Sequence, residues 1–317
     1  MKQFANLHLH STHSDGVYTP AELVEVAKNE GYRALALTDH DTTSGNAEVR
    51  EECRRAGLDY IFGCEFSSPW REKRINFHII GFDFDPEHPE MKDYLAQRSF
   101  CEAEQTRILF ERGLSEGLLH DITWNEVLEY NRGVTWLCNN HVFSTMKAKG
   151  LATDLDYMNF FRSVYGKRRG EVKPPYEFLP IDKMLRLIRD AGGFAVVAHP
   201  HNQLHAIPEL VSMGLSGLEV WHSLLTDSER LEALAIAKEH NLFISGGSDH
   251  EGLCGGYYST SEHPEQTAFY APELSLGTQE FFFREIKTRT LAPGRGELID
   301  KLIKTELEEQ NDETHSL

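Results

Sequence analysis

The sequence ALALTDHD, residues 34–41, is an apolar run of strand length that leads directly into two acids and a histidine. An apolar run followed by a side chain that can bind a metal recurs along the chain, before His8 and His10, Glu65, His199 and Asp249. Strands that all present such residues from one end are typical of a βα-barrel, whose chemistry lies at the C-terminal rim. The repetition therefore predicts an α/β, barrel-like fold with a metal site at that rim.

The alternation of strands and helices is interrupted once. Expected strands over 59–64 and 75–82, the second of which carries His78, precede a long helix-rich stretch, and the alternation resumes at Ile181. An interruption of this kind indicates an inserted subdomain. We therefore expect a discontinuous barrel core over 1–97 and 179–292, an inserted helical lid over 98–178, and a C-terminal helix with an acidic tail over 293–317.

Charge and composition limit the classes of partner. The formal net charge is −18, which argues against a long nucleic acid, because such partners are bound largely by Lys and Arg. A small phosphorylated substrate stays possible, since bound cations reverse the local sign. No apolar run is long enough to span a membrane, so we expect no membrane partner. The composition gives no oligomeric state.

The cysteines and the N-terminus indicate a cellular compartment. The five cysteines are widely spaced and lack a C-x-x-C pair, so we expect neither a disulfide framework nor a cysteine zinc site. Free cysteines fit a reducing compartment. Residues 1–4 lead straight into the first expected strand, without the apolar core of a signal peptide. Together these features predict a cytoplasmic protein.

Two motifs near the N-terminus supply the first candidate ligands. In His8-Leu9-His10 the two imidazoles lie on the same side of an extended segment, because side chains alternate along a strand. Asp15, within Ser14-Asp15-Gly16, either returns a carboxylate to the same rim or is only a turn residue. Each motif taken alone is compatible with a purely structural role.

Further candidate ligands follow or lie within later strands: His40, Glu65, His78, His199 and Asp249, with His250 and Glu251 in the loop after Asp249. This set is too large for one four-coordinate site, which predicts two or three divalent metal ions. Mixed histidine and carboxylate ligands suit Mn²⁺, Fe²⁺ or Zn²⁺. Clustered ions of this kind generate hydroxide at neutral pH and stabilise the entering and leaving oxygens of a displacement.

The motifs in this order resemble the PHP (polymerase and histidinol phosphatase) family, and in particular its stand-alone metal-dependent phosphoesterases. The matching motifs are His8-Leu9-His10-Ser11 with Ser14-Asp15-Gly16, Thr38-Asp39-His40-Asp41, Gly63-Cys64-Glu65, Ala198-His199-Pro200 and Gly247-Ser248-Asp249. The resemblance covers residues 4–252. It implies a distorted, TIM-like (βα)₇ barrel that holds a cluster of two or three metals.

The resemblance also implies how the ligands divide among the metals. The first metal is expected on His8, His10, Glu65 and Asp249, the second on Glu65, His78 and His199, and the third on Asp15 and His40 with the last histidine of a G-S-D-x-H-G motif. In this chain Glu251 takes the place of that histidine, and His250 comes one position early. Either Glu251 supplies a carboxylate, the loop presents His250, or the third site is weak.

The expected substrate-binding residues lie in the lid. Relatives commonly have an R-P-H motif there, whereas this chain has Asn139-Asn140-His141. His141 matches the histidine, but Asn139 replaces the arginine and cannot form a charged bidentate clamp on phosphate. Arg168, in the basic run 167–169, either contacts phosphate or is a solvated surface residue.

Three residues are left with two readings each. His201 either protonates the leaving oxygen or makes a structural hydrogen bond. His222 follows an expected strand and either is a second candidate catalytic residue at the rim or has no function there. Glu219 either orients a ligand histidine or takes part in catalysis.

The function expected from this reading is hydrolysis of a phosphate ester of a small metabolite, namely a nucleotide, a sugar phosphate or a cyclic sugar phosphate, by a hydroxide that bridges two metals. The alternatives are a cyclic phosphate dihydrolase acting on ribose 1,2-cyclic 5-phosphate-type substrates and a histidinol phosphatase. A non-catalytic, metal-binding regulatory module is the alternative from a different class. A nuclease is disfavoured by the acidic charge.

Overall fold

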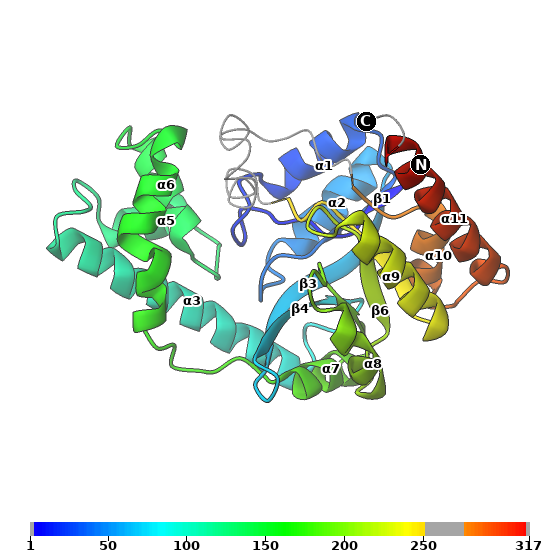
Figure 1. The fold of residues 1–317 in the computed structure, drawn as a ribbon. Helices are drawn as coiled ribbons and strands as arrows, with labels where there is room; N and C mark the ends of the chain where they lie inside the picture. The colour runs from blue at the N-terminus through cyan, green and yellow to red at the C-terminus, as the bar shows by residue number, and fades with distance from the viewer. Residues whose placement is uncertain (1–2, 251–275, 315–317) are drawn as a thin grey trace.

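The computed structural model describes residues 3–250 and 276–314, and within them seven strands form one sheet in the order β1 to β7 (Figure 1). The strands are β1 (Ala5–Asn6), β2 (Ala34–Leu37), β3 (Asp59–Trp70), β4 (Ile75–Phe82), β5 (Phe194–Val197), β6 (Gly217–Trp221) and β7 (Phe243–Gly246). The segments after β1 and β7 meet, since the amide of Asp249 donates to the carbonyl of His8 at 3.0 Å. The sheet is thereby nearly closed, and the predicted barrel-like α/β fold is confirmed.

One strand departs from the parallel arrangement. β4 is antiparallel to its neighbours β3 and β5, whereas the other neighbouring pairs are parallel. β3 continues to Trp70, beyond the expected end at residue 64, because β4 pairs with it along this extension. As a result Glu65 lies inside a strand and not after one. His78 lies near the start of β4, which an antiparallel strand places at the rim where its parallel neighbours end.

A cluster of buried apolar side chains fills the space enclosed by the sheet. Ala36, Ile61 and Val196 come from strands that are not all neighbours, yet they belong to one cluster. Phe283 and Ile286 of α10 (Glu280–Thr288) join it. Each fully buried side chain of this size contributes about 1.5–3 kcal/mol of burial free energy. The interior is therefore a packed core that supports the polar rim.

The remaining barrel helices follow the strands. They are α1 (Pro20–Asn29), α2 (Asn46–Ala56), α7 (Ile181–Asp190), α8 (Ile207–Ser212), α9 (Asp227–Glu239) and α11 (Arg295–Thr314). α1 begins with a capping box, in which the Thr19 hydroxyl accepts from the amide of Glu22 and the Glu22 carboxylate accepts from the amide of Thr19. A cap of this kind is worth about 1 kcal/mol. It sets the end of the loop that carries Asp15.

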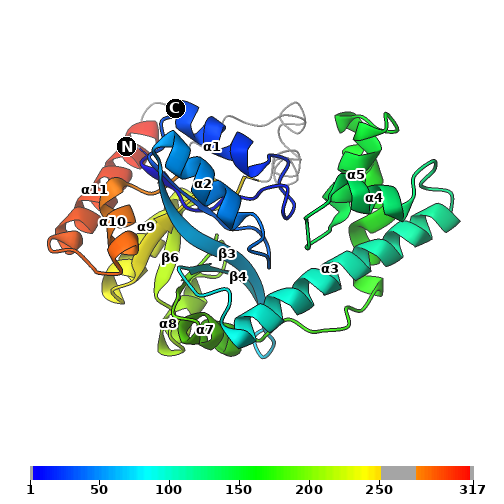
Figure 2. The ribbon, with the colours of Figure 1, turned by 180° about the vertical axis from the view of Figure 1, so that it is seen from behind.

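The helix-rich stretch between β4 and α7, called the lid below, contains α3 (Pro89–Ser115), α4 (Trp124–Tyr130), α5 (Asn139–Ala148) and α6 (Tyr157–Phe160). α3 runs from beneath the barrel out to the other lid helices, which stand beside the barrel (Figures 1 and 2). Met91, near its start, packs in the barrel core, whereas Leu109 and Phe110 pack in the lid core. No helix of the described residues is long and apolar enough to cross a membrane.

Candidate metal centre

The carboxylate of Glu65 lies at the centre of the site, and its side chain is fully buried. Five histidines surround it: His8, His10, His40, His78 and His199. Oε1 lies no more than 3.3 Å from ring nitrogens of His8, His78 and His199. Oε2 lies 3.0 Å from His40 Nδ1 and 3.4 Å from His10 Nε2. A carboxylate whose two oxygens face separate groups of imidazoles can join two cations.

The four residues expected for the first metal come together. Asp249 Oδ1 lies 3.0 Å from His10 Nε2 and 3.3 Å from His8 Nε2. One ligand atom from each of His8, His10, Glu65 and Asp249 lies within 4.8 Å of every other. The chain brings these residues from β3 and from the segments after β1 and β7, so the barrel closure described above creates the group.

The residues expected for the second and third metals lie on either side of Glu65. His78 Nδ1 and His199 Nε2 are each 3.1 Å from Glu65 Oε1. On the other side, Asp15 Oδ2 lies 3.4 Å from His40 Nε2. His10 Nδ1 lies 3.5 Å from Asp15 Oδ1, so His10 also belongs to this third group.

Two buried side chains, Glu219 and His222, contact the expected metal ligands and hold them in place. Glu219 Oε1 lies 3.2 Å from His8 Nδ1, and Glu219 Oε2 accepts from the amide of His199 at 2.7 Å. His222 Nδ1 accepts from the amide of Leu224 at 3.1 Å, and its Nε2 lies 3.2 Å from Asp249 Oδ2. Partners of this kind fix the orientation and tautomer of metal-binding groups. The geometry favours the orienting reading of Glu219.

The donor atoms at the centre fit divalent metal ions. His8 Nε2, His10 Nε2 and Glu65 Oε2 are buried and have no hydrogen-bond partner of acceptable geometry among the described residues, although charged neighbours lie 3.0–3.4 Å away. Buried polar atoms without a partner cost about 1–3 kcal/mol each. A histidine held through Nδ1 by a carboxylate, with Nε2 directed inward, is a common arrangement in metal sites.

The charges within the cluster shift the pKa values of its members strongly. Burial alone would raise the pKa of Glu65, but the imidazoles of His8, His78 and His40 hold it well below 4.5. Burial alone would lower the pKa of His40, but Asp15 and Glu65 raise it to about 9. Glu65 therefore stays ionised in spite of its burial, and the cluster attracts positive charge, as a cation site requires.

His201 and Arg168 are not brought to the cluster. His201 Nδ1 lies 2.9 Å from Glu229 Oε2, at the start of α9, so its ring is held at that helix. Arg168 donates to Glu116, the residue that follows α3, at 2.5 Å. Both side chains have an acidic partner, and that partner explains their placement.

The lid residues of the expected substrate site make bonds within the protein. Asn139 Nδ2 donates to Asn140 Oδ1 at 2.8 Å and to the hydroxyl of Tyr157 at 3.0 Å. His141 Nδ1 accepts from the amide of Cys138, and His141 Nε2 donates to the carbonyl of Thr12 at 3.0 Å. Both ring nitrogens of His141 are thus engaged with backbone groups, which leaves neither for a phosphate oxygen.

The loop after Asp249 is described only in part. His250 pairs through its backbone with the segment after β1, and its ring lies 5.5 Å from that of Tyr18. Burial and the nearby His10 lower the pKa of His250 to about 4. His250 does not belong to the ligand groups found among the described residues. Glu251 lies outside the described residues.

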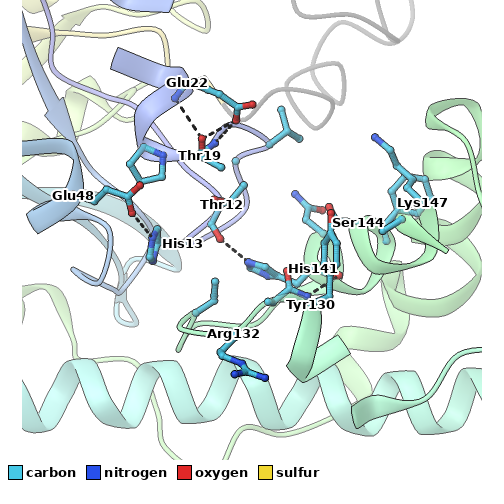
Figure 3. Close-up of a pocket in the computed structure, with 18 of the residues that line it drawn as sticks. Thr12, His13, Thr19, Glu22, Glu48, Tyr130, Arg132, His141, Ser144 and Lys147 are labelled. Carbon is cyan, nitrogen blue, oxygen red and sulfur yellow. Dashed lines mark hydrogen bonds and ion pairs between the residues drawn. The ribbon is translucent and has the colours of Figure 1, made fainter. Parts of the chain in front are cut away.

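A pocket of about 730 Å³ lies between the loop after β1 and the lid (Figure 3). The lid contributes Tyr130, Arg132 and Lys147 to its wall, and the barrel contributes Glu22 and Glu48. The pocket is also lined by Thr12 and Gly16, which flank the loop that carries Asp15. It is therefore next to the third ligand group.

Contacts between the lid and the barrel rim were not predicted from the sequence. Trp136 of the lid lies with its ring centroid 5.9 Å from that of His40. Arg98 of α3 lies 3.6 Å from Asp41, and both side chains are buried. The only sequence signal for the second contact is an arginine on the apolar side of a helix that otherwise buries Tyr94 and Leu95.

The PHP domain family model matches residues 6–143. Phosphoribosyl 1,2-cyclic phosphate 1,2-diphosphodiesterase of Eggerthella lenta is 30% identical over 257 residues, which is 79% of this chain and 95% of that protein. The 5′-3′ exoribonuclease Rnm of Salmonella typhimurium is 31% identical over 78% of this chain and 85% of that protein. The 3′,5′-nucleoside bisphosphate phosphatase of Chromobacterium violaceum is 27% identical over 77% of this chain and 86% of that protein.

Solved structures agree with the fold. A protein from Bifidobacterium adolescentis described as a metal-dependent phosphoesterase superposes with a TM-score of 0.72 at 26% identity, over 92% of this chain and 98% of that one. A protein from Chromobacterium violaceum described as an amidohydrolase, with bound sulfate, superposes with a TM-score of 0.66 at 25% identity, over 91% of this chain and 98% of that one.

The curated relatives named above carry the names of enzymes that cleave phosphoric esters. The predicted class, a phosphoric ester hydrolase that depends on metals, is confirmed at this level. Relatives that are 30% identical or more match 78–79% of this chain, and the family model and the clustered ligands agree with them. The chain belongs to the PHP domain family.

Proposed function

We propose that the protein hydrolyses phosphate esters of small metabolites at a cluster of two or three divalent cations, which are Mn²⁺, Fe²⁺ or Zn²⁺. The observation that carries this proposal is the placement of Glu65, whose two oxygens face separate groups of histidines. Histidine and carboxylate ligands together suit these ions.

Each cation is assigned to one ligand group. The first is held by His8, His10, Glu65 and Asp249, the second by Glu65, His78 and His199, and the third by Asp15 and His40 with His10 beside them. When bound, such ions activate water and neutralise charge on phosphate oxygens. The chain itself holds the ligands in place and orients the ester.

The residues behind the ligands act by positioning them. Glu219 orients His8 and the backbone of His199, and His222 orients Asp249. We assign His222 to this role because its Nδ1 is already an acceptor for a backbone amide, so Nε2 carries the hydrogen that faces the carboxylate. His201 is left outside the reacting groups because Glu229 holds its ring.

The substrate is assigned to the space between barrel and lid. A volume of about 730 Å³ falls in the range of pockets for small ligands. Arg132 and Lys147 bring positive charge to the pocket wall, where Glu129 lies 3.7 Å from Arg132 and Asp154 pairs with Lys147. Tyr130 is 56% exposed, which leaves its ring free to stack on a base or sugar. The sulfate bound by the Chromobacterium violaceum neighbour is an oxyanion of the same shape as phosphate.

Among small substrates, a cyclic sugar phosphate is the first choice. The Eggerthella lenta relative, named for a ribose cyclic phosphate, is matched over 95% of its length. Asn139 in place of an arginine disfavours substrates that need a bidentate clamp on a second phosphate. Nucleoside 3′,5′-bisphosphates and histidinol phosphate are the next candidates in this class.

Removal of nucleotides from an RNA 5′ end is a second candidate function. Two observations favour it: relatives named 5′-3′ exoribonuclease are 29–31% identical to this chain, and the pocket opens between two subdomains. The net charge of −18 opposes it, because a long strand would need basic residues along its path. A short oligonucleotide needs the fewest basic residues for binding.

We further infer a cytoplasmic location and a lid that extends over residues 98–178. The four cysteines in the described part of the chain are buried and free, as in a reducing compartment. The change from barrel core to lid core along α3 supports a boundary between Leu95 and Leu109.

The test is a turnover screen of the Mn²⁺-loaded protein. The substrates are a ribose 1,2-cyclic 5-phosphate, a nucleoside 3′,5′-bisphosphate, histidinol phosphate and a 5′-phosphorylated RNA hexamer. Glu65→Gln serves as the inactive control. The proposal is supported if the wild type, but not Glu65→Gln, releases phosphate from a small substrate or opens the cyclic phosphate. Turnover of the RNA and of no other substrate supports the second candidate. Absence of turnover on all four, with metals bound, favours the non-catalytic regulatory module.

A further inference from the structure

Three side chains of the lid form hydrogen bonds to the loop that carries Asp15. Each of them bonds a different backbone carbonyl of that loop: Cys138 Sγ to Ser14 O at 3.6 Å, Asn140 Nδ2 to Asp15 O at 2.5 Å, and His141 Nε2 to Thr12 O at 3.0 Å. The bonded groups are separated by more than 120 residues in sequence. The contact therefore exists only when the lid is docked on the barrel.

The tautomer of His141 is set by the lid itself. Its Nδ1 accepts from the amide of Cys138 at 2.9 Å, so Nε2 must carry the hydrogen. Nε2 donates that hydrogen to the carbonyl of Thr12, a bond that Figure 3 shows. His141 is 4% exposed, and its burial lowers its pKa. His141 is thus a neutral donor of fixed direction, suited to holding a carbonyl in place.

The barrel holds the other side of the same loop. Asp39 accepts from the amide and the hydroxyl of Ser11, each at 2.7 Å, and from the hydroxyl of Ser14 at 2.6 Å. The loop lies between Asp39 and the lid. Within the loop, the amide of Gly16 donates to the carbonyl of Ser11 at 3.0 Å and Ser14 Oγ donates to Asp15 Oδ1 at 3.3 Å. The lid adds the bond from Asn140 to the carbonyl of Asp15 itself.

His40, the other ligand expected for the third cation, is also flanked by the lid. Trp136 packs beside its ring, and Arg98 of α3 lies 3.6 Å from the neighbouring Asp41. Three ligands of the first two cations are held without the lid, because Glu65 and His78 lie within strands and the backbone of His199 is held by Glu219.

We propose that the docked lid completes the third cation site, with Cys138, Asn140 and His141 acting as positioning residues that set the Asp15 carboxylate opposite His40. This inference rests on the assignment of Asp15 and His40 to a cation under the proposed function. It assigns His141 to metal positioning and not to substrate binding. The affinity for the third cation therefore depends on the docking of the lid, whereas the affinity for the first two cations does not.

The test is a titration of the metal-free protein with Mn²⁺ alone. Binding is measured by calorimetry and by the electron paramagnetic resonance signal of free Mn²⁺. Wild type is expected to bind three equivalents. Asn140→Ala and His141→Ala are expected to weaken the third equivalent about 10- to 100-fold, as loss of an outer partner does, and to leave the first two unchanged. Asp15→Asn is expected to weaken the same equivalent.

Two further variants separate positioning from a general loss of structure. His141→Gln keeps an amide donor where Nε2 lies, so it should restore most of the third affinity. Ser163→Ala removes a lid hydroxyl that donates to Asn159 O within the lid, and it should leave all three equivalents as in wild type. Unchanged binding of the first two equivalents shows that a variant is folded.

Three results would overturn the inference: a wild type that binds two equivalents or fewer, equal weakening of all equivalents in His141→Ala, or no weakening in either lid variant. The proposed function fails separately. A protein with two equivalents that still hydrolyses phosphate esters contradicts the lid inference alone. A protein whose third equivalent depends on His141 but that turns over no phosphate ester contradicts the proposed function alone.

Discussion

The carboxylate of Glu219 lies behind the ring of His8, with Oε1 3.2 Å from Nδ1, and both side chains are fully buried. The opposite nitrogen of His8 faces Glu65. We expect Glu219→Gln to reduce the affinity for the first Mn²⁺ about 10- to 100-fold. The neutral side chain of glutamine lacks the negative charge that orients the imidazole of His8. Metal content after dialysis measures this. Glu232→Gln, at an exposed position of α9, is the control, and equal metal content in the two variants would argue against the role of Glu219.

Removal of metals should lower stability as well as activity. Ions that bind only the folded state stabilise it by about 2.7 kcal/mol per site when their concentration is one hundred times the dissociation constant. Treatment with a chelator should therefore lower the melting temperature, and added Mn²⁺ should restore both properties. A melting temperature that does not respond to chelator or Mn²⁺ would mean that the cluster holds no ion tightly.

The start of α9 should lose stability in acid. Burial alone would raise the pKa of Glu229, but the amides of Asn202 and Thr226 and the ring of His201 lower it from 4.5 to about 2. Because the folded pKa is below the unfolded one, the contribution is complete above pH 4.5 and is lost as the pH falls toward 2. Glu229→Gln should cost about 1 kcal/mol at pH 7. Urea unfolding should show that this difference shrinks between pH 4.5 and 2; a difference independent of pH would contradict the prediction.

The buried pair of Arg98 and Asp41 should be expensive to break. Replacing Arg98 with Met leaves a buried carboxylate without its cation, which costs about 3–5 kcal/mol. Asp41→Asn added to Arg98→Met removes the charge and keeps a residue that tolerates the positive φ of 47° at this position. Urea unfolding should therefore find the double variant more stable than Arg98→Met. The reverse order would show that Asp41 is not destabilised by the loss of its partner.

The sequence predicted most of the barrel because its signals are local. Apolar runs of strand length, the Thr19–Pro20 helix start and Gly57 at the end of α2 each act within a few residues. The antiparallel direction of β4 and the extension of β3 were not predicted, because pairing between strands depends on the partner and not on the pattern of one strand.

The ligand groups were predictable because barrel closure brings strand ends together, whatever the intervening sequence. Residues away from those ends were harder to place. His201 lies two residues after His199, yet Glu229 competes for its ring from another helix. The bond between His141 and Thr12 joins groups 129 positions apart and follows from the docking of the lid, for which the chain carries no local pattern. The roles of these residues stay predictions.

The most direct test of the central claim is the metal content of Glu65→Ala compared with that of wild type, measured by elemental analysis after both are loaded with Mn²⁺ and dialysed. Two or three ions per chain in the wild type and no more than one in the variant are expected, because one carboxylate joins the ligand groups. A wild type that retains a single ion, or a variant that retains the full number, would contradict the account.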